Sequence, residues 1–119
     1  MNKREIGTLK EKLAADFLVS QGLIIVARNF RCRMGEIDII AIEHGKTDTY
    51  VFVEVKYRSN KTMGEGYEAV DTRKRYKIIQ VARYFCMTKG GLIGYNLRFD
   101  VISILRDDIT WYKNAFMYE

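Results

Sequence analysis

Three residues of this chain could carry chemistry: an aspartate in one apolar segment, and a glutamate and a lysine two positions apart in the next. Asp38 lies within residues 35–41, and Glu54 and Lys56 lie within residues 49–58. Side chains two residues apart on a strand point to the same face, and pairing of the two segments would bring Asp38 beside them. Charged groups on an apolar surface need a partner, and the simplest one is a divalent cation that holds a phosphate.

This grouping suits metal-dependent hydrolysis of a phosphodiester bond. Mg²⁺ (or Mn²⁺) binds a few carboxylate or carbonyl oxygens, activates a water molecule and polarises the phosphate. We expect the metal ligands to be the carboxylates of Asp38 and Glu54 and the backbone carbonyl of Val55. Lys56 would orient or deprotonate the attacking water, or balance the developing charge, so the candidate catalytic residues are Asp38, Glu54 and Lys56.

A solvated strand face is the alternative interpretation. In that case Asp38 would simply end a strand, and Glu54 would pair with Lys56 in water, as alternating strands commonly allow. However, Asp38 shares its face with Ile40, and Glu54 shares its face with Phe52, so neither carboxylate lies on a polar face. Valines fill the opposite face of the second segment, and we therefore expect the sheet to be covered on both sides.

The spacing of apolar residues predicts one α/β domain, residues 1–119, in the order helix, three strands, helix, two strands. This order indicates a mixed sheet of about five strands flanked by helices, with the second helix carrying the chain over the sheet to the later strands. The expected helices are residues 4–21 and 71 or 72 to 87; the expected strands are residues 23–27, 35–41, 49–58, 97–105 and 109–112; residues 29–34 form a basic connection; and the buried face of the second helix uses Tyr76, Ile79, Ala82 and Tyr84 or Phe85.

The charge balance favours a nucleic acid as the partner. The chain has 20 Lys and Arg against 15 Asp and Glu, a net charge of +5, and its basic residues are clustered. Each phosphate that such a cluster neutralises releases counterions, although the same excess also serves solubility. The candidate contacts to a nucleic-acid backbone are Arg58, Arg73, Lys74, Arg75 and Lys77, and the candidates for stacking on unpaired bases are Tyr57, Tyr67 and Tyr76.

Several classes of protein are excluded by composition. No stretch has the length of a membrane span, and the charged first residues lack the apolar run of a signal peptide. The only histidine is His44, which excludes a zinc site built from several histidines, and the spacing of Cys32 and Cys86 matches no zinc or redox motif. We therefore expect a cytoplasmic protein with reduced thiols and no membrane partner.

The segments around these residues resemble a known family. Residues 35–41 (GEIDIIA) followed by residues 51–58 (VFVEVKYR) resemble the signature of the YraN-like family of uncharacterised bacterial proteins. That family is similar to the archaeal Holliday-junction resolvases and to the PD-(D/E)XK nuclease superfamily. The resemblance extends over nearly the whole chain, to Glu11 with Ala14 and Leu18, to residues 68–71 with Lys74, and to residues 98–101. Lys10 stands where the family usually has a glycine.

The resemblance implies a restriction-endonuclease-like core and assigns roles within it. Asp38 and Glu54 would be metal ligands, Lys56 the catalytic lysine, and Glu11 an acid of the first helix that reaches the metal directly or through water. A solvated position at the border of the helix is the alternative for Glu11. Glu36 is expected to pair with an arginine such as Arg33 instead of binding metal, and Asp100 is expected to be structural, paired with Arg98 or a helix terminus.

Together these observations predict a metal-dependent endonuclease, and DNA is favoured over RNA as the expected substrate. Similarity to resolvases favours branched or distorted DNA, and a two-armed substrate would suit a homodimer. One alternative is a nucleic-acid-binding module that keeps the nuclease fold without cutting. Another is a protein-interaction subunit that uses the edge of the sheet and binds neither metal nor nucleic acid.

Overall fold

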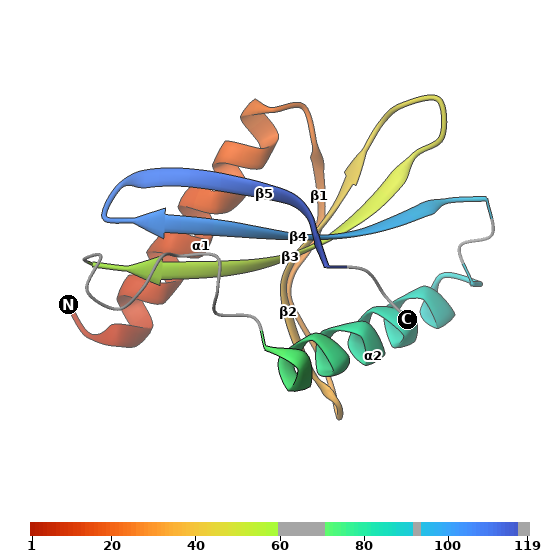
Figure 1. Ribbon diagram of the computed structural model, residues 1–119, viewed down its shortest axis with the longest axis horizontal. Helices are drawn as coiled ribbons and strands as arrows, with labels where there is room; N and C mark the ends of the chain where they lie inside the picture. The colour runs from red at the N-terminus through yellow and green to blue at the C-terminus, as the bar shows by residue number, and fades with distance from the viewer. Residues whose placement is uncertain (60–70, 92–93, 117–119) are drawn as a thin grey trace.

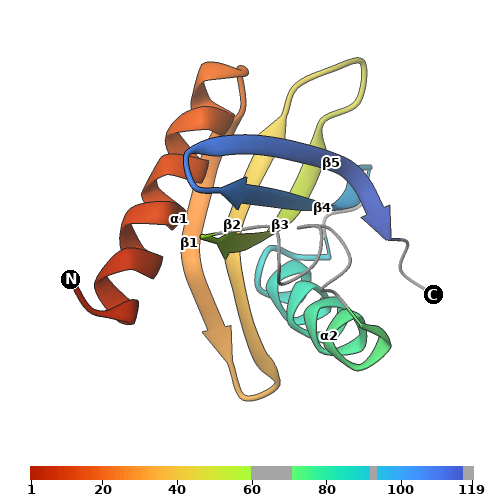
Figure 2. The same ribbon diagram turned by 60° about the vertical axis from the view of Figure 1, so that its left-hand side comes forward.

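The computed structural model describes residues 1–59, 71–91 and 94–116, and it shows a five-stranded sheet between two helices (Figures 1 and 2). In chain order the elements are α1 (Lys3–Ser20), β1 (Ile24–Cys32), β2 (Gly35–Glu43), β3 (Thr49–Arg58), α2 (Thr72–Thr88), β4 (Asn96–Leu105) and β5 (Asp108–Phe116). This order confirms the α/β fold predicted from the sequence. Neither of these two helices is long and apolar enough to cross a membrane.

The strands lie in the sheet in the order in which they occur along the chain. Strands β1, β2 and β3 form an antiparallel meander, and β4 and β5 form an antiparallel pair. Strands β3 and β4 are parallel, and a parallel pair requires a crossover, which α2 supplies. As a result α1 and α2 lie on opposite faces of the sheet (Figures 1 and 2).

Each helix covers its own apolar core, so the sheet is buried on both faces as expected. The core under α1 contains Ala14, Ala15, Leu18, Leu23, Ile39, Ala41, Val51, Val53, Ile102 and Ile104. The core under α2 is richer in aromatic side chains, with Phe52 edge-on to Phe85 and Phe99 stacked on Phe116. A charged group in either core therefore loses its hydration and needs partners within the protein.

Both helices begin at side-chain caps. The side chain of Asn2 accepts a hydrogen bond from the Glu5 N–H, and the side chain of Asp71 accepts one from the Lys74 N–H, each at 2.8 Å. Such caps satisfy N–H groups that have no partner within the helix. The cap of α2 also fixes the place in the first turn from which the Lys74 side chain leaves the helix.

Strand β1 is longer than the sequence predicts, because it continues through residues expected to form a connection. Residues 30–32 pair with residues 35–37 of β2. Asn29 adopts the left-handed conformation (φ 52°), which asparagine tolerates better than most residues, and the strand continues beyond it. Phe30 and Cys32 pack against the core under α2, while Arg31 is exposed. Arg31, which suggested a loop, thus occupies the outer face of a strand, while Arg33 lies in the turn that follows.

The buried face of α2 also differs from the expectation. Tyr76 and Tyr84 are exposed, by 64% and 44%, while Ile79, Ala82 and Phe85 are buried as predicted. The full buried set is Ile78, Ile79, Val81, Ala82, Phe85 and Cys86. A tyrosine at the border of the apolar arc is free to turn its hydroxyl to water, so the pattern alone does not fix its side.

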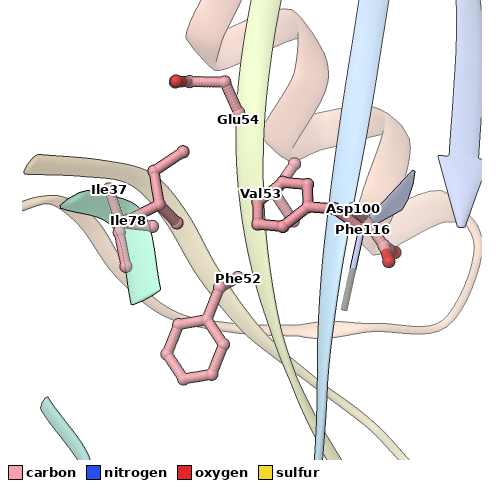
Figure 3. A pocket seen from close by; sticks show the side chains of 7 residues that line it. All are labelled: Ile37, Phe52, Val53, Glu54, Ile78, Asp100 and Phe116. Atoms are coloured by element: carbon pink, nitrogen blue, oxygen red, sulfur yellow. The ribbon is translucent and has the colours of Figure 1, made fainter. Parts of the chain in front are cut away.

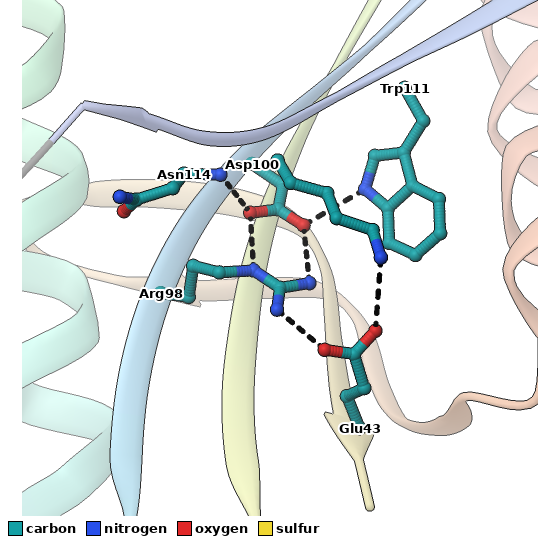
Figure 4. Close-up of polar contacts among 6 residues, drawn as sticks. Glu43, Arg98, Asp100, Trp111 and Asn114 are labelled. Atoms are coloured by element: carbon teal, nitrogen blue, oxygen red, sulfur yellow. Dashed lines mark hydrogen bonds and ion pairs between the residues drawn. The ribbon is translucent and has the colours of Figure 1, made fainter. Parts of the chain in front are cut away.

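A buried ionic network joins β2, β4 and β5 (Figure 4). Asp100 is fully buried and accepts hydrogen bonds from Arg98 Nε and Nη2, from Trp111 Nε1 and from the Asn114 N–H, at 2.8–2.9 Å. Arg98 Nη1 bonds to Glu43, so the guanidinium also has partners on both sides. These contacts confirm the expected pairing of Asp100 with Arg98.

We expect Asp100→Ala to lower the free energy of unfolding by about 3 kcal/mol or more, because it leaves the Arg98 guanidinium and the Trp111 N–H without their acceptor. Urea denaturation followed by circular dichroism measures the loss. The control is Asp107→Ala at the β4–β5 turn, whose side chain is 93% exposed; its cost should stay below about 0.5 kcal/mol. Equal losses in the two variants would contradict a structural role for the network.

Candidate active site

The candidate site lies where β2 leaves β3, in the region between residues 35–38 and 54–58, which we call the strand fork. The two strands pair from Glu43 and Thr49 as far as Ile39 and Val53, where the pairing ends. Beyond that point Asp38 Oδ2 accepts a hydrogen bond from the Val55 N–H at 2.8 Å. The N–H and C=O of a strand residue point to the same side, so the Val55 carbonyl also faces the strand fork.

A cleft of about 250 Å³ opens at the strand fork, beside the first two turns of α2. Glu54 is only 8% exposed, and Figure 3 shows its carboxyl group directed away from Phe52 and Phe116. Its backbone is therefore anchored in the apolar core while its carboxyl group reaches the cleft. The residues that line the cleft are Gly35, Glu36, Asp38, Glu54, Lys74, Lys77 and Ile78.

The carboxyl groups of Asp38 and Glu54 are hydrogen-bonded to each other and share one proton. Burial, together with this hydrogen bond and the charge of Glu54, raises the pKa of Asp38 to about 9, although the Val55 N–H acts in the opposite direction. Burial also disfavours the charge of Glu54, but hydrogen bonds from Asp38 and Lys74 outweigh it and lower the pKa of Glu54. Asp38 therefore carries the proton and Glu54 carries the charge.

Two lysines meet at this carboxyl pair. Lys74 Nζ lies 2.9 Å from Glu54 Oε2, and the side chain of Lys56 lies close to that of Lys74. Burial and the neighbouring Lys74 lower the pKa of Lys56 to about 8, against the pull of Glu54 and Asp38. Burial opposes the charge of Lys74, but its contacts with Lys56 and Glu54 outweigh burial and raise its pKa. Lys56 is thus the lysine that gives up a proton at mildly alkaline pH.

Glu11 approaches the same site from α1. Burial raises the pKa of Glu11, and the charges of Glu36 and Glu54 add to that effect, while Asn29 and Arg28 oppose it. Its Oε1 atom is buried without a hydrogen-bond partner. Asn29, which hydrogen-bonds to Glu11, was not predicted from the sequence as a site residue. The available signal was its residue type, because asparagine tolerates the left-handed conformation that bends β1 at this position.

The predicted nucleic-acid contacts are placed unevenly. Arg58 Nε is buried without a hydrogen-bond partner, and Lys77 lines the cleft. Arg73 is exposed, and Arg75 lies over the Phe116 ring, with its guanidinium carbon 5.7 Å from the ring centroid. The structure therefore brings Lys74 and Lys77 to the cleft and leaves the other cations of α2 outside it. Tyr67 and residues 68–70 lie outside the described residues.

Glu36 lines the cleft, and its ion-pair partner differs from the predicted one. Its Oε2 lies 3.3 Å from Nε of Arg31, not of Arg33, because β1 continues and places Arg31 opposite Glu36. Lys10 donates a hydrogen bond to the Arg106 carbonyl at 2.9 Å and lies over the Tyr57 ring. The lysine thus ties α1 to the β4–β5 turn and points away from the carboxyl pair.

Within residues 1–59, 71–91 and 94–116, no three His, Cys, Asp or Glu side chains gather closely enough to hold a metal ion by themselves. The donors at the strand fork are instead two carboxyl groups and one backbone carbonyl, with Glu11 nearby. Such a set fits Mg²⁺, which binds few protein oxygens and keeps several waters. The unpaired Oε1 of Glu11 supports this fit, since a cation or its water would satisfy it.

Comparison with known proteins identifies relatives over almost the whole chain. The model of the uncharacterised protein family UPF0102 matches residues 10–104. A UPF0102 protein from Lachnoclostridium phytofermentans is 45% identical, with 98% of this chain and 96% of the relative covered. Another from Fusobacterium nucleatum is 44% identical over 96% of this chain and 92% of the relative.

One solved structure, Pyrococcus furiosus SfsA in complex with Ca²⁺, is 16% identical with a TM-score of 0.32; the match covers 94% of this chain and 64% of that one. This likeness is too low to add to the argument. The family match and the bacterial relatives confirm the YraN-like resemblance, and the chain belongs to the uncharacterised protein family UPF0102.

Proposed function

We propose that this protein is a metal-dependent nuclease that hydrolyses phosphodiester bonds in DNA. The observation that carries the proposal is the pair of carboxyl groups of Asp38 and Glu54, which line one cleft at the strand fork beside the Val55 N–H and the Lys74 ammonium group. Two buried carboxyl groups in contact are unfavourable for folding, and a divalent cation in place of the proton would compensate both charges. The Val55 carbonyl faces the same space and would supply a third oxygen.

The side chains around the pair fit the requirements of phosphodiester hydrolysis. A bound Mg²⁺ or Mn²⁺ would polarise the phosphate and make a water molecule more acidic. Lys56, half-buried with a lowered pKa, would hold the attacking water and accept its proton. Arg58 Nε, buried without an acceptor, would donate to a phosphate oxygen.

The charge of α2 supports a nucleic-acid substrate. Its seventeen residues include Arg73, Lys74, Arg75, Lys77 and Arg83 and no Asp or Glu. A helix surface of one sign beside a phosphodiesterase site would follow the substrate backbone. The preference for DNA, and for branched or distorted forms, rests on the resemblance to junction resolvases. A symmetric pair of chains would present two sites to such a junction.

The first prediction from this proposal concerns metal binding and cleavage together. Asp38→Asn and Glu54→Gln should abolish Mn²⁺ binding in titration calorimetry, because each removes a carboxyl group that could bind the cation in its ionised form. Lys56→Met should keep Mn²⁺ binding and slow the cleavage of four-way, flapped or gapped DNA by about 100-fold or more, the typical contribution of a general base. Gel assays with labelled DNA measure the rates.

The matched control is Glu36→Gln, which removes a carboxylate from the same cleft without touching the pair. It should keep both Mn²⁺ binding and cleavage. Mn²⁺ binding that survives in Asp38→Asn and Glu54→Gln would refute the metal site. DNA binding in chelator, with no cleavage by any variant or substrate, would favour the binding module that keeps the fold without cutting.

The second prediction uses the shared proton. Unfolded Asp38 ionises near pH 4, whereas the folded protein holds this proton up to about pH 9. Between these values the folded state binds more protons, so the free energy of unfolding falls as pH rises. Asp38→Asn removes this dependence. At pH 8 the free energy of unfolding of the variant should therefore exceed that of the wild type by on the order of 2 kcal/mol.

Urea denaturation in EDTA between pH 5 and pH 8 tests this prediction. The range stops at pH 8 because above that pH the lowered pKa of Lys56 adds an opposite slope that offsets the one from Asp38. Asp107→Asn, at an exposed turn, should show the slope of the wild type. Parallel curves for the wild type and Asp38→Asn would mean that Asp38 is already ionised in the folded protein.

A further inference from the structure

Lys74 makes an unusual contact for the first turn of a helix. Its N–H is capped by Asp71, and its ammonium group lies 2.9 Å from Glu54 Oε2. The amino end of a helix carries a partial positive charge, so a cation is unfavourable there unless an anion lies close by. The Asp71 carboxylate at this helix end is bonded to the Lys74 N–H, and the first turn of α2 contains no acidic residue, so the anion that the Lys74 ammonium group contacts is Glu54 on β3.

The same carboxylate is needed for the metal. Glu54 is buried and has room for few partners, which at present are the Asp38 proton and the Lys74 ammonium. A divalent cation bound by Glu54 and Asp38 would lie within a few ångströms of that ammonium. Like charges at such separations repel strongly where water is scarce, so the cation and Lys74 compete for one carboxylate.

A displaced Lys74 would still have a place in the cleft. Its side chain is 43% exposed, and four flexible carbons allow the ammonium to move without a change in the helix. Lys77, one turn further along α2, already lines the same cleft. The phosphate that a loaded metal would hold is the nearest new anion for both lysines.

From these contacts we propose that Lys74 couples metal loading to substrate binding: it neutralises Glu54 while the cleft holds no metal, and the arriving cation transfers it to the phosphate of the substrate. The inference rests on the proposed function and extends it. Lys74 thereby acts in two ways of opposite sign, as a competitor of the metal and as a ligand of the DNA. Replacing a lysine with only a structural role would not change the affinities for metal and for DNA in opposite directions.

The test compares Lys74→Met, Lys74→Arg and Lys77→Met. Titration calorimetry with Mn²⁺ alone, at one pH and low ionic strength, should give Lys74→Met about tenfold tighter binding, because the competing charge is gone. At saturating Mn²⁺, the KM of this variant for a four-way DNA junction should rise by about tenfold, because a phosphate ligand is lost. Lys74→Arg keeps the charge and should restore both values towards those of the wild type.

Lys77→Met is the matched control, since it removes the same charge from the same cleft but not from Glu54. It should raise the KM for the junction and change the Mn²⁺ affinity by less than about threefold. Equal tightening in Lys77→Met and Lys74→Met would overturn the proposal, because it would show a general effect of net charge. Weaker Mn²⁺ binding in Lys74→Met would also overturn it and would make Lys74 a support for the orientation of Glu54.

Mn²⁺ binding by the wild type distinguishes failure of the Lys74 coupling from failure of the proposed nuclease function. Absence of Mn²⁺ binding to the wild type, or binding unchanged in Asp38→Asn, would refute the nuclease proposal and the coupling with it. Normal binding that is lost in Asp38→Asn but unchanged in Lys74→Met would refute the coupling alone. Thermal melting checks that each variant is folded. If Lys74→Met does not fold, the comparison of Lys74→Arg with the wild type tests the proposal instead.

Discussion

The hydrogen bond from the Val55 N–H to Asp38 is the contact on which the candidate site depends. A backbone N–H inside a sheet must find an acceptor, and a continued β2–β3 ladder would have placed Ile37 opposite Val55. Because a side chain takes that role, β2 is free to leave β3 and the cleft can open. The same bond fixes the Asp38 carboxyl group where burial and Glu54 act on it. The use of a side-chain acceptor in place of a backbone acceptor thus opens the cleft and also places the Asp38 carboxyl group in it.

Three acidic residues of this fold, two buried and one partly buried, show how differently such groups can be accommodated. Asp100 is surrounded by donors from Arg98, Trp111 and Asn114, and no acceptor capacity is left for a ligand. Asp38 and Glu54 face each other instead, and the donors that stabilise them are the Val55 N–H, the Lys74 ammonium group and the proton of Asp38. A fully satisfied network stabilises the fold, whereas a partly satisfied one stores unfavourable energy that a ligand can release.

The sequence was most informative where local pattern and burial agree. Strand β3 has the predicted bounds because β-branched residues on one face alternate with Phe52, Glu54 and Lys56 on the other. The fold followed from the order of such segments. The end of β1 was missed because Arg28, Arg31 and Arg33 suggest a loop by composition. Arg31 nevertheless lies in the strand, between Phe30 and Cys32, which are both partly buried.

Part of the site could not be read from local pattern at all. Asp38, Glu54 and Lys56 were found because two neighbouring strands carry them. Lys74 was assigned to a basic surface, since its contact with Glu54 depends on how α2 crosses the sheet, and no spacing along the chain encodes that crossing. Asn29 was missed for the same reason, because its importance comes from the bend opposite Asp38 and from the approach of α1.

The parallel pairing of β3 with β4 also bears on the order in which the protein folds. The β1–β2–β3 meander joins neighbours in the sequence, and Asp38 and Val55 are only 17 residues apart. Closure of β3 onto β4 must wait for a long loop, and non-local closure of this kind is the slow part of folding. We therefore expect Asp38 and Glu54, on β2 and β3, to come together early in folding. The docking of α2 would then be drawn in part by charge, with Lys74 arriving last at a carboxylate already in place.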